Sequence, residues 1–111
     1  MQFDEYQKLA ARTDAFSKPD SLLDPAFLEK VLGLVGESGE FADKIKKLIR
    51  DQNGEITDKD ELVKELGDVL WYLAMIANYL DVDLSAVAKE NIAKLADRQK
   101  RNIIKGAGDN R

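Results

Sequence analysis

The sequence has 111 residues, of which 44% are hydrophobic and 34% charged, and it contains neither cysteine nor histidine. This length and composition predict one globular domain over residues 1–111. The missing residue types exclude a disulfide framework, a typical zinc site, a Ser-His-Asp triad within one chain type and the Glu-x-x-His ligands of ferritin-like bundles.

The net charge of −4 at pH 7 disfavours nucleic acid as the main partner. No stretch of 18 apolar residues is present, so no membrane span is predicted. No basic-then-apolar signal segment opens the chain, and cysteine is absent, which leads us to expect a cytoplasmic protein. A chain this short has limited capacity to bury a core, so self-association would supplement it.

Four helices and no strand are predicted, which is an all-α fold. The first helix is expected over residues 3–16 and stops before Pro19, because proline disfavours the helical conformation of the preceding residue. Asp24 and Pro25 predict the N-cap and first position of a second helix, which extends to residue 49 or 50.

The turn residues Asn53 and Gly54 separate the second helix from the third. Asp58 predicts the N-cap of the third helix, and Glu61 completes a capping box. The third helix is apolar nearly all round, which predicts a central and largely buried position.

Two pairs of carboxylates, one on each of these two helices, are the main chemical signal. Glu37 pairs with Glu40 and Glu65 with Asp68; residues three apart share a helix face. The short connection over residues 51–57 favours antiparallel packing that brings the pairs together. Four converging carboxylates repel one another unless a cation intervenes, and an all-oxygen set suits Mg²⁺ or Mn²⁺. The alternative is two amphipathic helices with ordinary surface acids.

Glycines accompany both pairs, at Gly36, Gly39 and Gly67. A glycine inside a helix costs about 1 kcal/mol relative to alanine. The positions therefore predict a close approach by a neighbouring helix or a ligand.

The fourth helix is expected from about Asp83 to about Ile104 and carries a polar stripe. Asn91, Lys94 and Arg98 lie on one face at helical spacing. Such a stripe is either a solvated basic face or a set of phosphate contacts. Residues 89–105 hold six basic and two acidic residues, whereas residues 51–68 hold seven acidic and two basic ones. An acidic metal-binding half and a basic last helix together suit a polyphosphate substrate.

Three segments resemble the MazG-like nucleotide pyrophosphohydrolases, an all-helical superfamily: GLVGESGEFADKIKK, ELVKELGDVLWYLAMIA and NIAKLADRQKR. The family pattern is a pair of glutamates three apart, then a spacer, then Glu-x-x-Asp. Glu37 and Glu40 match its first part, and Glu65 and Asp68 its second.

The resemblance extends to the last helix, where Asn91, Lys94 and Arg98 match the family's Asn-x-x-Lys-Leu-x-x-Arg segment. Many members carry one more glutamate at the position of Gly36, so the number of metal ions and the group that activates water stay open.

The resemblance implies Mg²⁺-dependent hydrolysis of (deoxy)nucleoside triphosphates to nucleoside monophosphate and pyrophosphate, with water attacking the α-phosphate. It implies a MazG-like helical bundle completed as a homodimer or a dimer of dimers, in which each site draws on both chains. The four matched acids, with Lys94, are then the expected catalytic set, and the acids are the metal ligands. Asn91, Lys94 and Arg98 are expected to bind the substrate, with Lys94 as the leading phosphate contact.

The base pocket is expected beside Asp68. Trp71 and Tyr72 follow this residue by three and four positions, so one or both can reach the metal's neighbourhood; the alternative is that they are core aromatics. The first helix, through Tyr6 or Gln7, is the other candidate wall. The preferred base and sugar remain open.

Two rival functions fit the same pattern. One is a non-catalytic helical dimer that acts as a nucleotide-sensing or regulatory module. The other is a phosphatase acting on small phosphate esters, which would release orthophosphate. Release of pyrophosphate distinguishes the enzyme from both.

Overall fold

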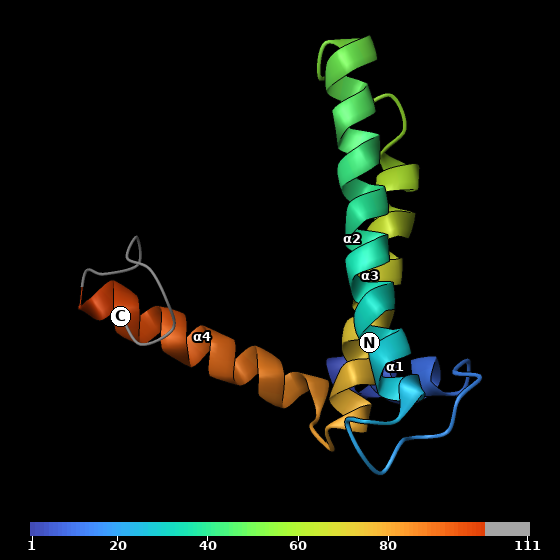
Figure 1. The fold of residues 1–111 in the computed structure, drawn as a ribbon. Helices are drawn as coiled ribbons and strands as arrows, with labels where there is room; N and C mark the ends of the chain where they lie inside the picture. Colours follow the sequence, from blue (N-terminus) through green and yellow to red (C-terminus); the bar gives the residue numbers. More distant parts are fainter. Residues whose placement is uncertain (102–111) are drawn as a thin grey trace.

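The computed structural model describes residues 1–101, and within them it contains four helices and no strand (Figure 1). The prediction of an all-α fold is therefore confirmed. The helices are α1 (Phe3–Ala11), α2 (Pro25–Gln52), α3 (Lys59–Tyr79) and α4 (Leu84–Lys100). None of the described helices is both long enough and apolar enough to cross a membrane.

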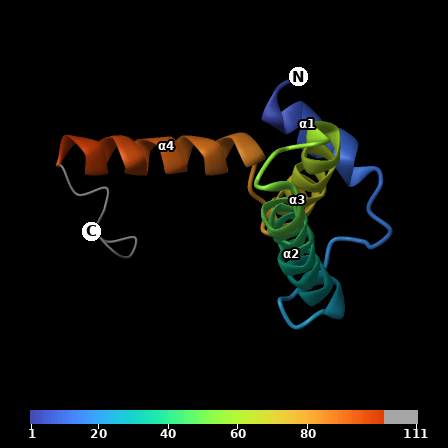
Figure 2. The ribbon, with the colours of Figure 1, turned by 90° about the horizontal axis from the view of Figure 1, so that it is seen from above.

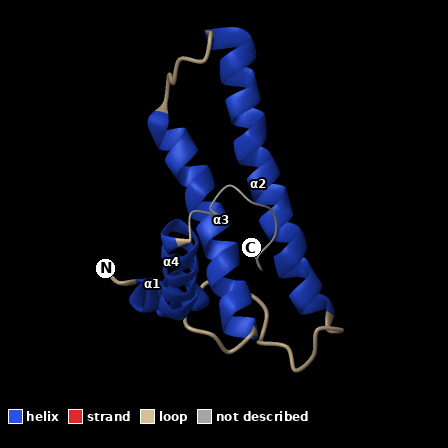
Figure 3. Ribbon diagram, turned by 90° about the vertical axis from the view of Figure 1, so that its left-hand side faces the viewer, coloured by secondary structure: helices blue, strands red, loops and turns tan. Residues whose placement is uncertain are grey.

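The two longest helices, α2 and α3, form an antiparallel hairpin, as predicted (Figure 3). Asp24 starts α2 by accepting a 2.9 Å hydrogen bond from the Ala26 amide. Asn53 ends it in the left-handed conformation with φ of 55°, and Gly54 follows with φ of 79°. Asp58 then caps α3 by accepting from two amides of its first turn. These local signals determine where the chain reverses.

One predicted helix end was wrong, and another falls outside the described residues. The first helix ends at Ala11 rather than residue 16. The Thr13 hydroxyl donates to the Ala10 carbonyl, and the Asp14 carboxylate accepts from the Phe16 amide, so these side chains compete with the helical backbone. The predicted end of the last helix, at Ile104, lies outside the described residues.

The N-terminal helix α1 meets the start of α4 (Figure 1). The Gln7 side chain is buried; its Nε2 donates to the Val82 carbonyl at 2.9 Å and its Oε1 accepts from the Leu84 amide at 2.8 Å. Asp4 accepts from both the amide and the hydroxyl of Ser85. The N-cap residue of α4 makes no capping bond with its own side chain, so α1 supplies this cap. Gln7 is consequently a structural link between α1 and α4.

A small core lies beside this junction, between α1, the last turns of α3 and the start of α4. Its members are Ala10, Ala74, Met75 and Leu84, with Tyr6, Leu70 and Trp71 packed against them.

The prediction of a largely buried third helix is wrong for a single chain. Leu66 is 51% exposed, Leu73 43% and Leu80 51%. The reason is the direction of α4, which leaves the base of the hairpin and extends away from it (Figures 1 and 2). Beyond the first turn of α4, only α1 and α2 cover α3, and a row of leucines along α3 stays exposed.

Candidate active site

Three of the four carboxylates predicted as metal ligands lie together between α2 and α3. Glu37 comes from α2, Glu65 and Asp68 come from α3, and one carboxylate oxygen of each lies within 4.8 Å of the others. The antiparallel hairpin places residues distant in sequence at the same height. Three converging carboxylate oxygens form a donor set that fits a hard divalent cation.

The carboxylates of this acidic cluster repel one another. Burial, followed by repulsion from Asp68 and Glu65, raises the pKa of Glu37 above its ordinary value. Burial and the charge of Asp68 also raise the pKa of Tyr6 on α1. Negative charge is therefore concentrated at one point of the hairpin, which a cation would relieve.

Glu40, the fourth predicted ligand, is exposed and does not belong to this group of three. Its charge nevertheless contributes to the raised pKa of Glu37, so it lies near the cluster. On α2 it is one turn further toward the connection with α3.

The glycines beside the acids do not mark a close approach within this chain. A Cβ atom added at Gly36, Gly39 or Gly67 would have no neighbour within 4 Å. The close approach occurs instead at Gly33, one turn before Glu37, where an added Cβ would lie 2.1 Å from Cε1 of Tyr72.

A pocket of about 340 Å³ opens beside the acidic cluster, and both predicted aromatic residues line it. Its other lining residues are Glu37, Asp68 and Thr13. Trp71 and Tyr72 meet edge to face at 4.9 Å between ring centroids. The Trp71 indole donates a 2.7 Å hydrogen bond to the Thr13 hydroxyl. The two rings are half-buried, so they contribute both to packing and to a surface that a planar ligand could contact.

A buried ion pair lies behind this pocket. Lys30 on α2 is 1% exposed, and its Nζ lies 3.0 Å from Asp14 Oδ1 and 5.4 Å from the centroid of the Trp71 ring. Tyr79 donates a 2.5 Å hydrogen bond to the other oxygen of Asp14. Burial alone would lower the pKa of Lys30, but its hydrogen bonds with neighbouring carboxylates raise it overall. Lys30 thus holds the segment after α1, with Thr13, against the pocket.

The predicted substrate-binding residues of the last helix are not brought to the acidic cluster within one chain. Asn91 and Lys94 line a separate hollow of about 600 Å³ along α4, and Arg98 lies one turn further along, where it is buried. The reason is that α4 extends away from the hairpin (Figure 1).

Several residues of the site had not been identified from the sequence. They are Thr13 and Lys30 beside the pocket, and Lys44, which forms ion pairs with Glu61 and Glu65 across the hairpin. Lys44 follows Glu37 by seven residues, and residues at this spacing share a helix face, so the sequence could have predicted that Lys44 lies on the side of α2 that carries the acids.

The fold and site together define an all-α domain with a carboxylate cluster at the centre of a helical hairpin. The MazG nucleotide pyrophosphohydrolase domain matches residues 27–103. The chain is also 46% identical, over 116 aligned positions covering all of both chains, to the gene 37 protein of Mycobacterium phage L5. A comparison with solved structures found no significant match. The chain belongs to the MazG nucleotide pyrophosphohydrolase family.

Proposed function

We propose that this protein hydrolyses (deoxy)nucleoside triphosphates to nucleoside monophosphate and pyrophosphate, with water attacking the α-phosphate. The observation that carries the proposal is the convergence of Glu37, Glu65 and Asp68 beside a pocket walled by two aromatic rings. A cation site next to a surface for a planar base suits a nucleotide whose phosphates lie at the cation.

We propose Glu37, Glu65 and Asp68 as ligands of Mg²⁺, or of Mn²⁺ in its place, with Glu40 as the fourth. The fit rests on the all-oxygen donor set and on the unbalanced charge that raises the pKa of Glu37. When bound, the ion would neutralise charge on the phosphates and lower the pKa of a bound water. The three acids would hold the ion, and the aromatic rings that line the pocket would contact the substrate.

Trp71 and Tyr72 are proposed as the wall against which the base lies. Both line the pocket that Glu37 and Asp68 also line, so a base there would be close to the acids. The hydrogen bond from Trp71 to Thr13 holds the indole in place, which reduces the entropy lost when a base binds.

The phosphate contacts are proposed to come from a second copy of the chain. Lys94, supported by Asn91 and Arg98, would hold the outer phosphates as charged and polar donors. The direction of α4 supports this arrangement, since an arm that leaves its own hairpin can reach that of a partner (Figure 2).

A homodimer, or a dimer of dimers, is proposed for the same reason. The row formed by Leu66 and Leu73 on α3 and by its C-cap residue Leu80 is exposed in one chain. Exposed apolar side chains also lie along α2 and α4: Leu28, Leu32, Val35, Val87, Ile92 and Leu95. Burial of such faces is a large driving force for association, so light scattering at micromolar concentration should show a mass above the 12.4 kDa of one chain.

The direct test is a screen of the common ribo- and deoxynucleoside triphosphates with Mg²⁺, with the products separated by chromatography. The proposal expects monophosphate and pyrophosphate in equal amounts, and none after the divalent ion is chelated. Orthophosphate as the first product would indicate phosphatase chemistry. Nucleotide binding without turnover of any substrate would favour the non-catalytic sensing module.

The shared site has its own test, in which two inactive variants are mixed. Glu65→Gln removes a metal ligand and Lys94→Ala removes a phosphate contact. If each site draws on two chains, a mixed dimer contains one intact site, and random pairing restores about a quarter of the unsubstituted activity. No recovery after refolding the two variants together would contradict sharing, whereas the reaction itself would still stand.

A further inference from the structure

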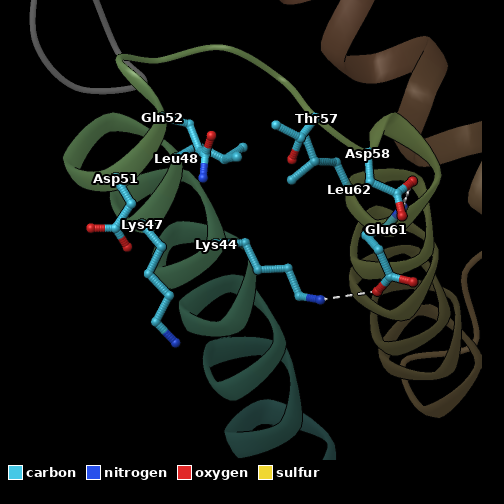
Figure 4. A pocket seen from close by; sticks show the side chains of 9 residues that line it. All are labelled: Lys44, Lys47, Leu48, Asp51, Gln52, Thr57, Asp58, Glu61 and Leu62. Atoms are coloured by element: carbon cyan, nitrogen blue, oxygen red, sulfur yellow. Dashed lines mark hydrogen bonds and ion pairs between the residues drawn. The ribbon is translucent and has the colours of Figure 1, made fainter.

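Lys44 on α2 reaches across the hairpin and binds two carboxylates of α3. Its Nζ lies 3.2 Å from Glu61 Oε2 and 3.3 Å from Glu65 Oε1. Figure 4 shows the contact with Glu61 beside the hollow near the connection between α2 and α3. Because Glu65 is also a member of the acidic cluster, a side chain of the protein itself brings a positive charge to the edge of that cluster.

The two partners of Lys44 are not equivalent. Glu61 Oε1 also lies 3.1 Å from the Nζ of Lys64, so this carboxylate keeps a cation without Lys44. Glu65, with 15% of its side chain exposed, lies close to Glu37 and Asp68 and forms an ion pair with Lys44. Because Lys44 contacts both carboxylates, it can move away from Glu65 and still remain paired with Glu61.

An ammonium group and a divalent ion would compete for the same carboxylate. An ammonium ion 3.3 Å from Glu65 Oε1 cancels part of the negative potential that attracts a metal ion. It also occupies space next to an oxygen that would coordinate the ion. The same contact reduces repulsion among the three acids when no ion is bound.

We propose that Lys44 is a built-in counter-cation, which holds Glu65 in the absence of a divalent ion and is displaced toward Glu61 when that ion binds. This inference rests on the proposed metal site. It makes Lys44 a positioning residue, because it acts through Glu65 rather than on the substrate. The affinity of the site for its ion is then lower than the acids alone would give, and the ion-free hairpin is more stable.

Lys44→Met tests the proposal, with Lys47→Met as the matched control. Lys47 is three residues along the same helix and pairs with Asp43 of α2 at 2.8 Å, so the control removes the same charge without touching Glu65. Mn²⁺ binding is measured by calorimetry and by the electron spin resonance signal of free Mn²⁺, at constant ionic strength and without nucleotide. Lys44→Met should bind Mn²⁺ about three- to tenfold more tightly than the unsubstituted protein, and Lys47→Met within about twofold.

Melting temperature provides a second measurement. Without a divalent ion, Lys44→Met should melt at a lower temperature than Lys47→Met, and the difference should shrink at saturating Mn²⁺. Lys44→Arg keeps the charge and should retain the unsubstituted affinity. Lys44→Gln, which is uncharged but polar, takes the place of Lys44→Met if that variant does not fold.

The outcomes separate this inference from the proposed function. Equal Mn²⁺ affinity in Lys44→Met and Lys47→Met, with clear binding by the unsubstituted protein, would overturn the role of Lys44 and leave the metal site intact. Weaker binding in Lys44→Met would also overturn it, because the lysine would then support the bound state. If the unsubstituted protein binds no Mn²⁺, the metal site and the role of Lys44 are both wrong.

Discussion

The aromatic ring of Tyr72 occupies the space that a side chain at Gly33 would need. An added Cβ would lie 2.1 Å from its Cε1 atom and 2.3 Å from Cζ. Since Tyr72 also lines the pocket beside the acidic cluster, Gly33 determines how closely α3 and this ring approach α2.

Gly33→Ala should therefore displace Tyr72 and destabilise the protein by about 1–3 kcal/mol, the usual cost of overpacking. The control is Gly36→Ala on the same helix, where the added atom meets nothing within 4 Å. This control should gain up to about 1 kcal/mol from helix propensity. Chemical denaturation of both variants measures the difference, and equal stability would show that Tyr72 can move at no cost.

Replacing Trp71 with leucine should change the discrimination among bases more than the turnover of the best substrate. The indole lines the pocket and is held by Thr13 at 2.7 Å, whereas leucine offers neither the flat surface nor the hydrogen bond. Ratios of kcat/KM for pairs of nucleotides measure the effect. Thr13→Val, which removes the hydrogen bond and keeps the ring, should shift these ratios less. Loss of folding with unchanged ratios would assign Trp71 to the core alone.

Glu65→Gln and Asp68→Asn should abolish pyrophosphate release while leaving the metal-free protein folded. Asp68→Asn should also be slightly more stable without metal, whereas Glu65→Gln loses the ion pair with Lys44 and should gain less. Each change removes one of the charges that raise the pKa of Glu37, so repulsion in the cluster falls. Melting with and without Mg²⁺ and pyrophosphate release are measured on the same samples. Asp60→Asn, an exposed acid at the start of α3, serves as the control and should keep its activity. Activity retained in both cluster variants would refute the metal site.

The buried ion pair behind the pocket predicts a loss of stability in alkali. Burial and the hydrogen bond with Asp14 raise the pKa of Tyr79 from 10.0 to about 12. A raised pKa in the folded state means that the stabilisation is complete below pH 10 and is lost as the pH rises toward 12. The pKa of Lys30 is also raised, so its contribution disappears in the same direction.

Melting temperatures across pH 9 to 12 should show this loss, and Tyr79→Phe should reduce it, although Tyr6 and Tyr72 still titrate. Lys30→Met leaves Asp14 buried without its cation and should cost about 3–5 kcal/mol at neutral pH. A flat alkaline profile in the unsubstituted protein would contradict this account.

Gln7→Ala should loosen α4 without affecting the acidic cluster. The substitution leaves the Val82 carbonyl and the Leu84 amide without their partner, which costs about 1–3 kcal/mol for buried groups. Hydrogen exchange should accelerate at the first amides of α4 and remain unchanged in the middle of α2. Lys8→Ala, an exposed neighbour on α1, is the control. If exchange at Leu84 did not change, the cap would come from elsewhere.

The parts of the structure that were predictable from the sequence are those set by local chemistry. Asp24, Asn53 and Asp58 mark helix ends through interactions with residues a few positions away, and the hairpin follows from them. The convergence of Glu37 with Asp68 also follows, because helical spacing and a short connection leave few arrangements.

Other features depend on contacts that sequence spacing does not encode. Glu37 and Glu40 share a face, but only the packed hairpin decides which of them meets α3. Which glycine allows close packing depends on where the Tyr72 ring lies, and this selects Gly33 rather than Gly36. The direction of α4 depends on hydrogen bonds made by Gln7, whose identity alone gives no sign of them.

The cap that α1 provides for α4 also bears on the order in which the molecule assembles. Its hydrogen bonds join residues 75, 77 and 81 positions apart, whereas Lys44 and Glu61 in the hairpin are 17 apart. Short loops close at a lower entropic cost than long ones. We therefore expect the hairpin of α2 and α3, which carries the acids, to form first during synthesis. The helix α4, which carries Lys94 and Arg98, is fixed in its direction only after it has itself been made.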